Sequence, residues 1–200
     1  MTGPGRGVRP SSGEIDRGIL DITAGFIARR GIKDTAVQAV ADQAGYSKAG
    51  ILSRFGSKEL LVRAAVAQAV EQTEAILALA DGATPGPAKD AAALAGLTDL
   101  ALARPGWAEL VLAALALRRG DDVSDRLGPV AAALLGMFGI DIESAASTSL
   151  ERRAAVTGAV GALIVLSLTY MTEASAEQAR PHLLQTGWNA LGHGGPFPGA

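Results

Sequence analysis

Apolar residues recur at intervals of three and four positions through the first third of the chain, and a glycine closes each group. This spacing is typical of amphipathic helices that end at a left-handed residue. The first apolar stripe comprises Ile15, Ile19, Leu20, Ile22, Phe26 and Ile27. Ser11 and Glu14 have the spacing of a capping box, so the pattern predicts a helix that begins after Ser11 and stops at Gly31.

Two shorter apolar groups follow, at residues 36–44 and 48–55, each closed by a glycine. Ser47 and Ser57 stand where N-cap residues are expected, and a longer helix should run over residues 58–79. Two short helices separated by about four residues have the proportions of a helix-turn-helix. The inward face expected for the long helix consists of Leu60, Leu61, Ala64 and Ala67.

The segment 81–87, DGATPGP, predicts a linker, and the chain beyond it is rich in alanine and leucine without strand-like alternation. The pattern predicts further helices over residues 88–103, 105–119, 122–138, 150–172 and 176–191. Thr148 and Ser175 begin capping-box spacings at the last two. Prolines at 129 and 181 make two of these helices less regular. The whole chain is therefore predicted to be all-α.

Composition excludes several classes of site. The 200 residues include no cysteine and only two histidines, which excludes disulfides, cysteine nucleophiles and cysteine- or histidine-rich metal centres. We therefore expect no metal and no cofactor. Charge is divided unevenly: residues 1–65 carry ten Lys and Arg against six Asp and Glu, a net +4, and the remainder carries −6. The imbalance indicates an N-terminal part that faces a polyanion.

An enzyme is not expected. Residues 45–49, GYSKA, lack the final glycine of a nucleophile elbow, and a predicted helix rather than a strand precedes the serine. The Ser-Lys pairs at 47–48 and 57–58 are adjacent rather than one helical turn apart. The chain has no phosphate-cradling loop motif.

Residues 14–66 resemble the DNA-binding domain of the tetracycline-repressor (TetR) family of transcriptional regulators. The residues that carry the resemblance are Arg17, Ile19-Leu20-Asp21, Phe26-Ile27, Gly31, Thr35, Val37, Val40-Ala41, Ala44-Gly45, Ser47-Lys48, Phe55 and Ser57-Lys58-Glu59-Leu60-Leu61. The resemblance implies an all-α fold with an N-terminal three-helix helix-turn-helix DNA-binding domain and a C-terminal helical ligand-binding and dimerisation domain. The expected divisions are a flexible tail at 1–12, the DNA-binding domain at 13–66, the ligand-binding and dimerisation domain at 67–191 and a second flexible tail at 192–200.

A recognition helix at residues 48–55 would enter the major groove, and the start of the next helix would meet phosphate. The expected DNA-binding residues are Thr35, Gln38, Tyr46, Ser47, Lys48, Ala49, Gly50, Ser53, Arg54 and Lys58. The sequence departs from the family pattern at Leu52 and Ser53, where the family carries an aromatic residue, and at Arg54, where it carries histidine. Arg6 and Arg9 are interpreted as a minor-groove arm or as part of a disordered tail.

The C-terminal part suggests a dimer and an effector pocket. Residues 154–172 carry no charge, which is typical of a membrane span or of a buried or interfacial helix, and we favour the second because polar residues interrupt the run. In the family the last two helices pair with those of a second copy. The expected interface residues are Val156, Val160, Leu163, Ile164, Leu168 and Trp188. Four large side chains are interpreted either as the lining of an apolar effector pocket or as ordinary core: Trp107, Met137, Phe138 and Tyr170.

Taken together, the sequence predicts a cytoplasmic homodimer that binds a palindromic operator in double-stranded DNA. It would act as a repressor released by a small, largely hydrophobic effector. Two alternatives remain open: a helical ligand-binding or scaffold dimer that has lost specific DNA binding, and a membrane-associated protein.

Overall fold

The computed structural model of the protein describes residues 11–116, 122–170 and 175–198. Within these residues the chain is helical and contains no strand, so the all-α prediction is confirmed. The helices are α1 (Ser12–Asp34), α2 (Val37–Ala44), α3 (Lys48–Phe55), α4 (Lys58–Asp81), α5 (Pro87–Ala103), α6 (Pro105–Ala116), α7 (Asp122–Gly136), a 3₁₀ turn (Ala145–Ser147), α8 (Leu150–Tyr170) and α9 (Ala176–Ala190). The expected arm with Arg6 and Arg9 lies outside the described residues.

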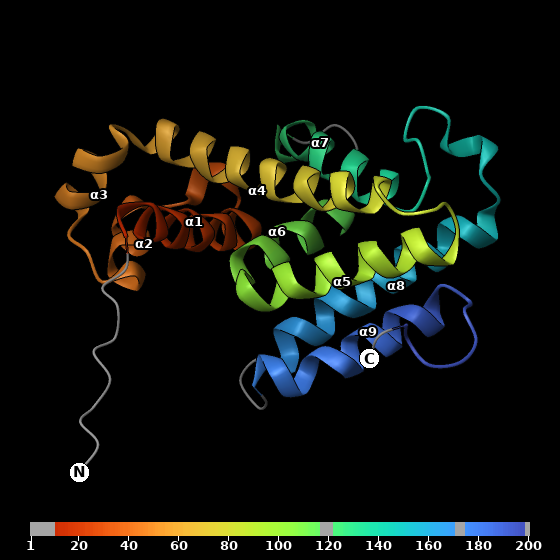
Figure 1. Ribbon diagram of the computed structural model, residues 1–200. Coiled ribbons are helices and arrows are strands. Elements are labelled where there is room, and N and C mark those ends of the chain that lie inside the picture. Colours follow the sequence, from red (N-terminus) through yellow and green to blue (C-terminus); the bar gives the residue numbers. More distant parts are fainter. Residues whose placement is uncertain (1–10, 117–121, 171–174, 199–200) are drawn as a thin grey trace, which may run out of the picture.

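Helices α1, α2 and α3 gather at one end of the molecule (Figure 1). The predicted capping box starts α1: Ser11 Oγ accepts the Glu14 amide at 3.2 Å, and the Glu14 carboxylate accepts the Ser11 amide at 2.6 Å. Gly31 breaks the helix as expected, with φ at 77°, but helical backbone resumes after it and α1 ends at Asp34.

This end of the molecule has a small core of its own. The core contains Ile19, Phe26, Val37, Val40, Ala41, Ile51 and Leu61. Phe55 packs against it from the end of α3, as expected. Seven side chains from four helices therefore hold the short α2 and α3, which are too short to be stable as isolated helices.

Helix α4 runs from this end into the rest of the protein (Figure 1). Of its predicted inward face, Leu61 is buried and Ala64 is half-buried. Leu60 is 48% exposed and Ala67 is also exposed, whereas Val62 and Ala65 are buried. The difference arises because α4 packs against α1 on one side and against α5 and α7 on another, so more than one of its faces is covered.

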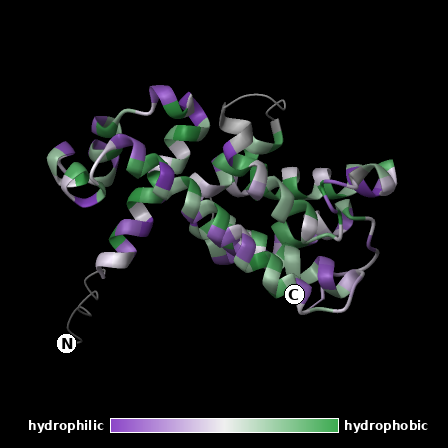
Figure 2. Ribbon diagram, turned by 90° about the horizontal axis from the view of Figure 1, so that it is seen from above, coloured by the Kyte–Doolittle hydropathy of each residue, from purple (hydrophilic) through white to green (hydrophobic). Residues whose placement is uncertain are grey.

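Helices α5 to α9 enclose the main core, which includes Ile76 of α4 and Trp107 of α6. Figure 2 shows apolar residues concentrated where these helices meet. Helices α7 and α9 continue through their prolines at 129 and 181. The start of α8 corrects one prediction: Ser149, not Thr148, accepts the amide of Arg152, at 3.2 Å. Ser175 forms its expected capping box with Gln178.

The residues after α9 differ from the expected frayed tail: residues 192–198 fold back against the protein. Phe197 is buried and its ring meets Trp188 edge-on, while His193 stacks on the same indole with centroids 3.9 Å apart. His193 Nε2 also lies 2.8 Å from the buried carboxylate of Asp90, which receives two hydrogen bonds from Arg152 at 2.6 and 3.0 Å. This ion cluster ties α5, α8 and the C-terminal segment together.

Candidate nucleic-acid interface

A tight turn joins α2 to α3 and determines the angle between them. Gly45 has φ at 74°, a left-handed conformation that glycine adopts without strain, and the amide of Tyr46 donates to the carbonyl of Ala41 at 2.9 Å. Ser47 then caps α3 by accepting the amide of Gly50 at 3.0 Å. Ser47 is therefore occupied in holding the helix start, which is the role that its position predicts.

The outer face of α3 is open. Lys48, Ala49, Gly50 and Ser53 are exposed, and Tyr46 is 42% exposed just before the helix. Ile51 is 1% exposed and faces the small core instead. The face thus offers one cation, one hydroxyl and a nearly bare backbone, which permits close approach to a groove floor.

Arg54 is engaged by the protein itself. Its guanidinium pairs with Asp16 and donates to the carbonyl of Ser12 at 2.9 Å, both on the first turn and a half of α1. The hydrogen bond to Asp16 is the main reason that the pKa of Arg54 is raised above its ordinary value. The sequence predicts a DNA contact here, whereas the structure shows a side chain that anchors α3 to α1.

Two other predicted residues are also engaged by the protein. Thr35 is 1% exposed and its hydroxyl donates to the carbonyl of Gly31 at 2.8 Å, so it neither caps α2 nor reaches the surface. Gln38 is exposed, and its amide donates to Asp42 one turn later, at 2.6 Å.

Lys58 lies at the start of α4, next to the Ser57 cap. Its ammonium donates to the carbonyl of Lys33 at the end of α1, at 2.6 Å. An ammonium has three protons to donate, so this contact leaves two for another acceptor. Lys58 therefore combines a fixed position with remaining capacity for an anion.

An acidic side chain of α1 connects this end of the protein to its main core. Asp21 accepts the amides of Gly106 and Trp107, at 3.1 and 2.9 Å, which are unpaired donors at the start of α6. Burial raises the pKa of Asp21, and these two hydrogen bonds oppose the shift. The Trp107 indole continues the connection inward by donating to Thr73 of α4 at 3.0 Å.

Comparison with known families decides the class of this interface. Residues 19–65 match the family described as bacterial regulatory proteins, tetR family. This match identifies the N-terminal part of the chain with the TetR family. TetR-family regulators are DNA-binding transcriptional regulators, and in this one α2 and α3 form the helix-turn-helix within the matched residues.

Solved structures of similar proteins were also found, and no curated protein matches the chain in sequence. A candidate TetR-family transcriptional regulator from Rhodococcus sp. is 24% identical, with 86% of this chain and 95% of that chain covered and a TM-score of 0.43. A TetR-like transcriptional regulator from Rhodococcus sp. RHA1 is 18% identical, with 92% and 99% covered and a TM-score of 0.48. A TetR-family regulator from Streptomyces coelicolor A3 is 20% identical, with 94% and 99% covered and a TM-score of 0.40.

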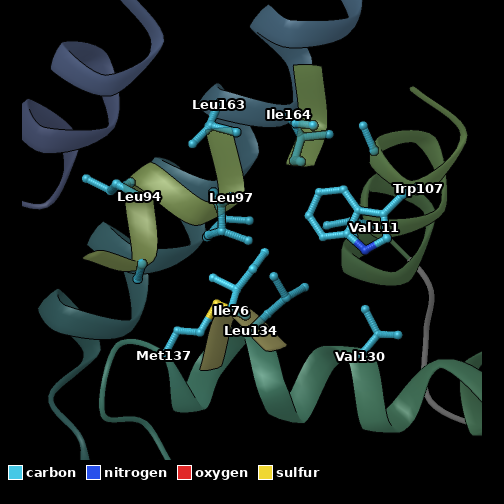
Figure 3. Close-up of a cluster of buried hydrophobic side chains, with 14 of the residues drawn as sticks. Ile76, Leu94, Leu97, Trp107, Val111, Val130, Leu134, Met137, Leu163 and Ile164 are labelled. Atoms are coloured by element: carbon cyan, nitrogen blue, oxygen red, sulfur yellow. The ribbon is translucent and has the colours of Figure 1, made fainter. Parts of the chain in front are cut away.

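The residues predicted to line an effector pocket in this TetR-family protein do not all lie together. Trp107, Met137 and Phe138 are buried in the main core, and Figure 3 shows the Trp107 indole pointing into the space bounded by α5, α7 and α8. Tyr170 is 44% exposed at the end of α8. Among the described residues, no group of three His, Asp or Glu side chains could hold a metal ion.

The residues predicted to form the dimer interface mostly face the protein's own core. Val156, Val160, Leu163 and Ile164 are each at most 2% exposed. By length and composition α8 could cross a membrane, and 33% of its most apolar stretch is buried against other helices of the protein. The outward positions of α8 are different ones. They include Leu150, Thr157, Gly158, Val165 and Tyr170.

Sequence reasoning missed the contacts by which Asp21 and Thr73 connect α1 and α4 to α6. In the sequence Asp21 stands out only as part of the family motif, because a single aspartate in an amphipathic helix is usually exposed to solvent. Its partners are 85 and 86 positions away, and no local pattern connects them.

Proposed function

We propose that this TetR-family regulator is a cytoplasmic homodimeric repressor, with no membrane association, that leaves a palindromic operator when a small, largely hydrophobic effector binds its C-terminal domain. The observation that carries the proposal is the open face of α3, held in place by a buried core behind it. A single eight-residue helix reads few base pairs, so two symmetry-related copies are needed for useful specificity.

Lys48 and Ser53 are the base-facing side chains we assign to α3, and Lys58 is the phosphate-facing one. Lys48 and Ser53 are exposed and have no competing side-chain partner among the described residues, and Lys58 retains donors beyond its bond to Lys33. Gly50 and Ala49 contribute by bringing the helix backbone close to the bases. Arg54 supports the interface from behind through Asp16.

The effector acts through Trp107 in this account. The indole lies in an apolar core beside Leu97, Val111 and Ile164, so a ligand that enters there is largely hydrophobic and must displace or press on it (Figure 3). The backbone of Trp107 is fixed to Asp21 on α1, and its ring is fixed to Thr73 on α4. Movement of the indole is therefore transmitted to α1 and α4, the two helices that support the helix-turn-helix.

The required energies are modest. An effector releases DNA only if it binds the DNA-incompetent arrangement more tightly. A coupling free energy of roughly 1–3 kcal/mol corresponds to about 5- to 150-fold in operator affinity. The loss or rearrangement of a few hydrogen bonds at the α1–α6 contact is of this size.

The dimer would form through the outward face of α8. Leu150 is 72% and Val165 46% exposed, and a Cβ at Gly158 or Gly161 would meet nothing within 4 Å. Small and apolar residues together allow a second helix to approach closely. Val165→Glu should convert the protein to a monomer in light scattering, whereas Leu79→Glu on α4, where the apolar side chain is 70% exposed, is the matched control and should leave the dimer intact.

Selection from a pool of random DNA duplexes tests the function. The proposal predicts enrichment of an inverted repeat whose half-sites lie about one DNA turn apart. Enrichment of no motif would favour the alternative, a helical ligand-binding or scaffold dimer without specific DNA binding. The almost bare outer face of α3, at Ala49 and Gly50, is the feature that keeps this alternative in view.

A further inference from the structure

A cavity lies at the edge of the main core, between the end of the protein that carries α2 and α3 and the body formed by α5 to α9. It has a volume of about 450 Å³ and is bounded by the end of α1, the first two turns of α4 and the start of α7. Its lining residues are Ile32, Lys33, Lys58, Glu59, Val62, Arg63 and Arg126. The volume is within the usual range of small-molecule sites.

The lining is strongly cationic. Four of its residues are lysine or arginine and one is acidic, in a chain whose overall charge is −2. Glu59 offsets only one of the four charges: hydrogen bonds from its own backbone amide and from the Ser57 hydroxyl lower its pKa and keep it ionised, which leaves the lining with a net charge of +3.

No carboxylate pairs with these four cations in the described part of the chain, and Lys58 alone has a hydrogen-bond partner, the carbonyl of Lys33. Among the described residues, none of the four forms a salt bridge, although Arg29, Arg54, Lys89, Arg152 and Arg180 all do. Like charges placed around one concavity repel each other, and a bound anion removes that cost. Binding of an anion in this cavity is therefore electrostatically favourable.

We propose that this cavity binds a phosphorylated small molecule through Arg63 and Arg126, with Lys33 and Lys58 completing the positive wall. Arginine is suited to phosphate because its planar guanidinium donates two parallel hydrogen bonds. The site differs from the hydrophobic effector site proposed above: Val62 and Ile32 in its wall border the main core, but none of its four cations belongs to that core.

The position of the cavity gives the ligand a regulatory effect. Arg126 belongs to α7, whereas Lys33, Lys58 and Arg63 belong to α1 and α4, so an anion held by both groups bridges the body and the end that carries α2 and α3. Such a bridge would restrict the angle between them. A phosphorylated metabolite would thereby adjust operator affinity independently of the hydrophobic effector.

Inorganic pyrophosphate is the probe, titrated into the full-length protein by calorimetry at constant ionic strength and without DNA. The expected result is saturable binding with one site per chain. Arg126→Gln and Arg63→Gln should each weaken it about tenfold, which is 1.4 kcal/mol and the size of one charged hydrogen bond. Arg126→Lys, which retains the charge, should weaken it less.

Two matched controls remove the same charge elsewhere. Lys48→Gln is on the outer face of α3, and Arg180→Gln is on α9, where the arginine pairs with Asp99. Both should leave pyrophosphate affinity within about twofold. Unchanged circular dichroism melting curves exclude unfolding as the cause, since Arg63 and Arg126 are exposed.

Three results would overturn the proposal. The first is no saturable binding, and the second is loss of binding in Lys48→Gln but not in Arg126→Gln, which would place the anion on the DNA face. The third concerns the slope of log DNA affinity against log salt concentration. If Arg126→Gln reduces this slope by about one and leaves pyrophosphate affinity unchanged, DNA phosphate is the occupant. The calorimetry needs no operator, so its failure is distinct from failure of the proposed repressor function.

Discussion

The carboxylate of Asp21 on α1 caps the start of α6 by accepting the amide of Trp107 at 2.9 Å. Gly106, the residue before, lies so close to α1 that a Cβ there would be 1.8 Å from the Asp21 carbonyl oxygen. The backbones of α1 and α6 are therefore in direct contact, with no side chain between them to absorb movement. We expect a displacement in the main core to move the helix-turn-helix through this contact.

Gly106→Ala should separate α6 from α1. The overlap with a backbone atom cannot be relieved by a side-chain rotation, so we expect a loss of about 3 kcal/mol in the free energy of unfolding, measured with urea. Gly18→Ala is the matched control, because a Cβ there meets nothing within 4 Å inside α1. It should stabilise the protein by about 0.5–1 kcal/mol through helix propensity. Equal effects of the two substitutions would contradict the close contact.

Asp21→Asn should change the pH dependence of stability. Burial raises the pKa of Asp21 above its ordinary 3.8 in the folded protein, so the folded state holds this proton more tightly than the unfolded state. The contribution of Asp21 to stability is therefore largest below pH 3.8 and is lost as pH rises through the raised folded-state pKa. Urea midpoints of the wild type and Asp21→Asn should be measured over a series of pH values. As the pH is lowered, the midpoint of the wild type should rise relative to that of the variant. A constant difference at all pH values would count against this account.

Arg54→Gln and Lys48→Gln remove the same charge but should have different effects. Arg54 pairs with Asp16, so its loss should loosen α3 and lower both the melting temperature and the DNA affinity. Lys48 has no such partner among the described residues, so its loss should leave the melting temperature unchanged and weaken DNA binding. Melting curves of both variants, compared with anisotropy titrations, separate the two roles. If Arg54→Gln melts as the wild type does, Arg54 is free for DNA and its anchoring role is wrong.

Phe197→Ala should show that the C-terminal segment is part of the folded domain. Phe197 is 6% exposed and packs against Trp188, so its truncation should cost about 2–3 kcal/mol and move the tryptophan fluorescence to longer wavelength. Pro198→Ala, one exposed residue later, should change neither. Unchanged fluorescence in Phe197→Ala would mean that the segment is not docked in solution.

Helix positions could be predicted from sequence because their signals are local. Ser11, Ser47, Ser57 and Ser175 are N-caps as expected, and Gly45 ends α2 in the left-handed conformation that its position predicts. Capping depends on residues within one turn, and a single chain shows them directly.

The parts that could not be predicted depend on contacts between distant residues. Which face of α4 is buried depends on its packing against α1, α3, α5 and α7, and the family pattern cannot reveal that Arg54 pairs with Asp16, 38 positions earlier. The docking of residues 192–198 escaped prediction for the same reason: glycine and proline indicate irregular backbone, but not whether Phe197 finds a partner.

The dimer residues illustrate a further limit. The apolar stripe of α8 is visible in the sequence, but both a core and an interface require apolar residues, and Val156 and Leu163 are at the core. Only the packing of α8 against α5, α6 and α9 distinguishes its inner face from the outer face that carries Val165.

The central claim is that this protein binds a specific DNA sequence through α3. The most direct test is fluorescence anisotropy with the duplex immediately upstream of its own gene, at two salt concentrations, with a scrambled duplex and the Lys48→Gln variant beside it. The account predicts tight, salt-sensitive binding that prefers the native duplex, and weaker binding by Lys48→Gln. No binding to either duplex at low salt would contradict it.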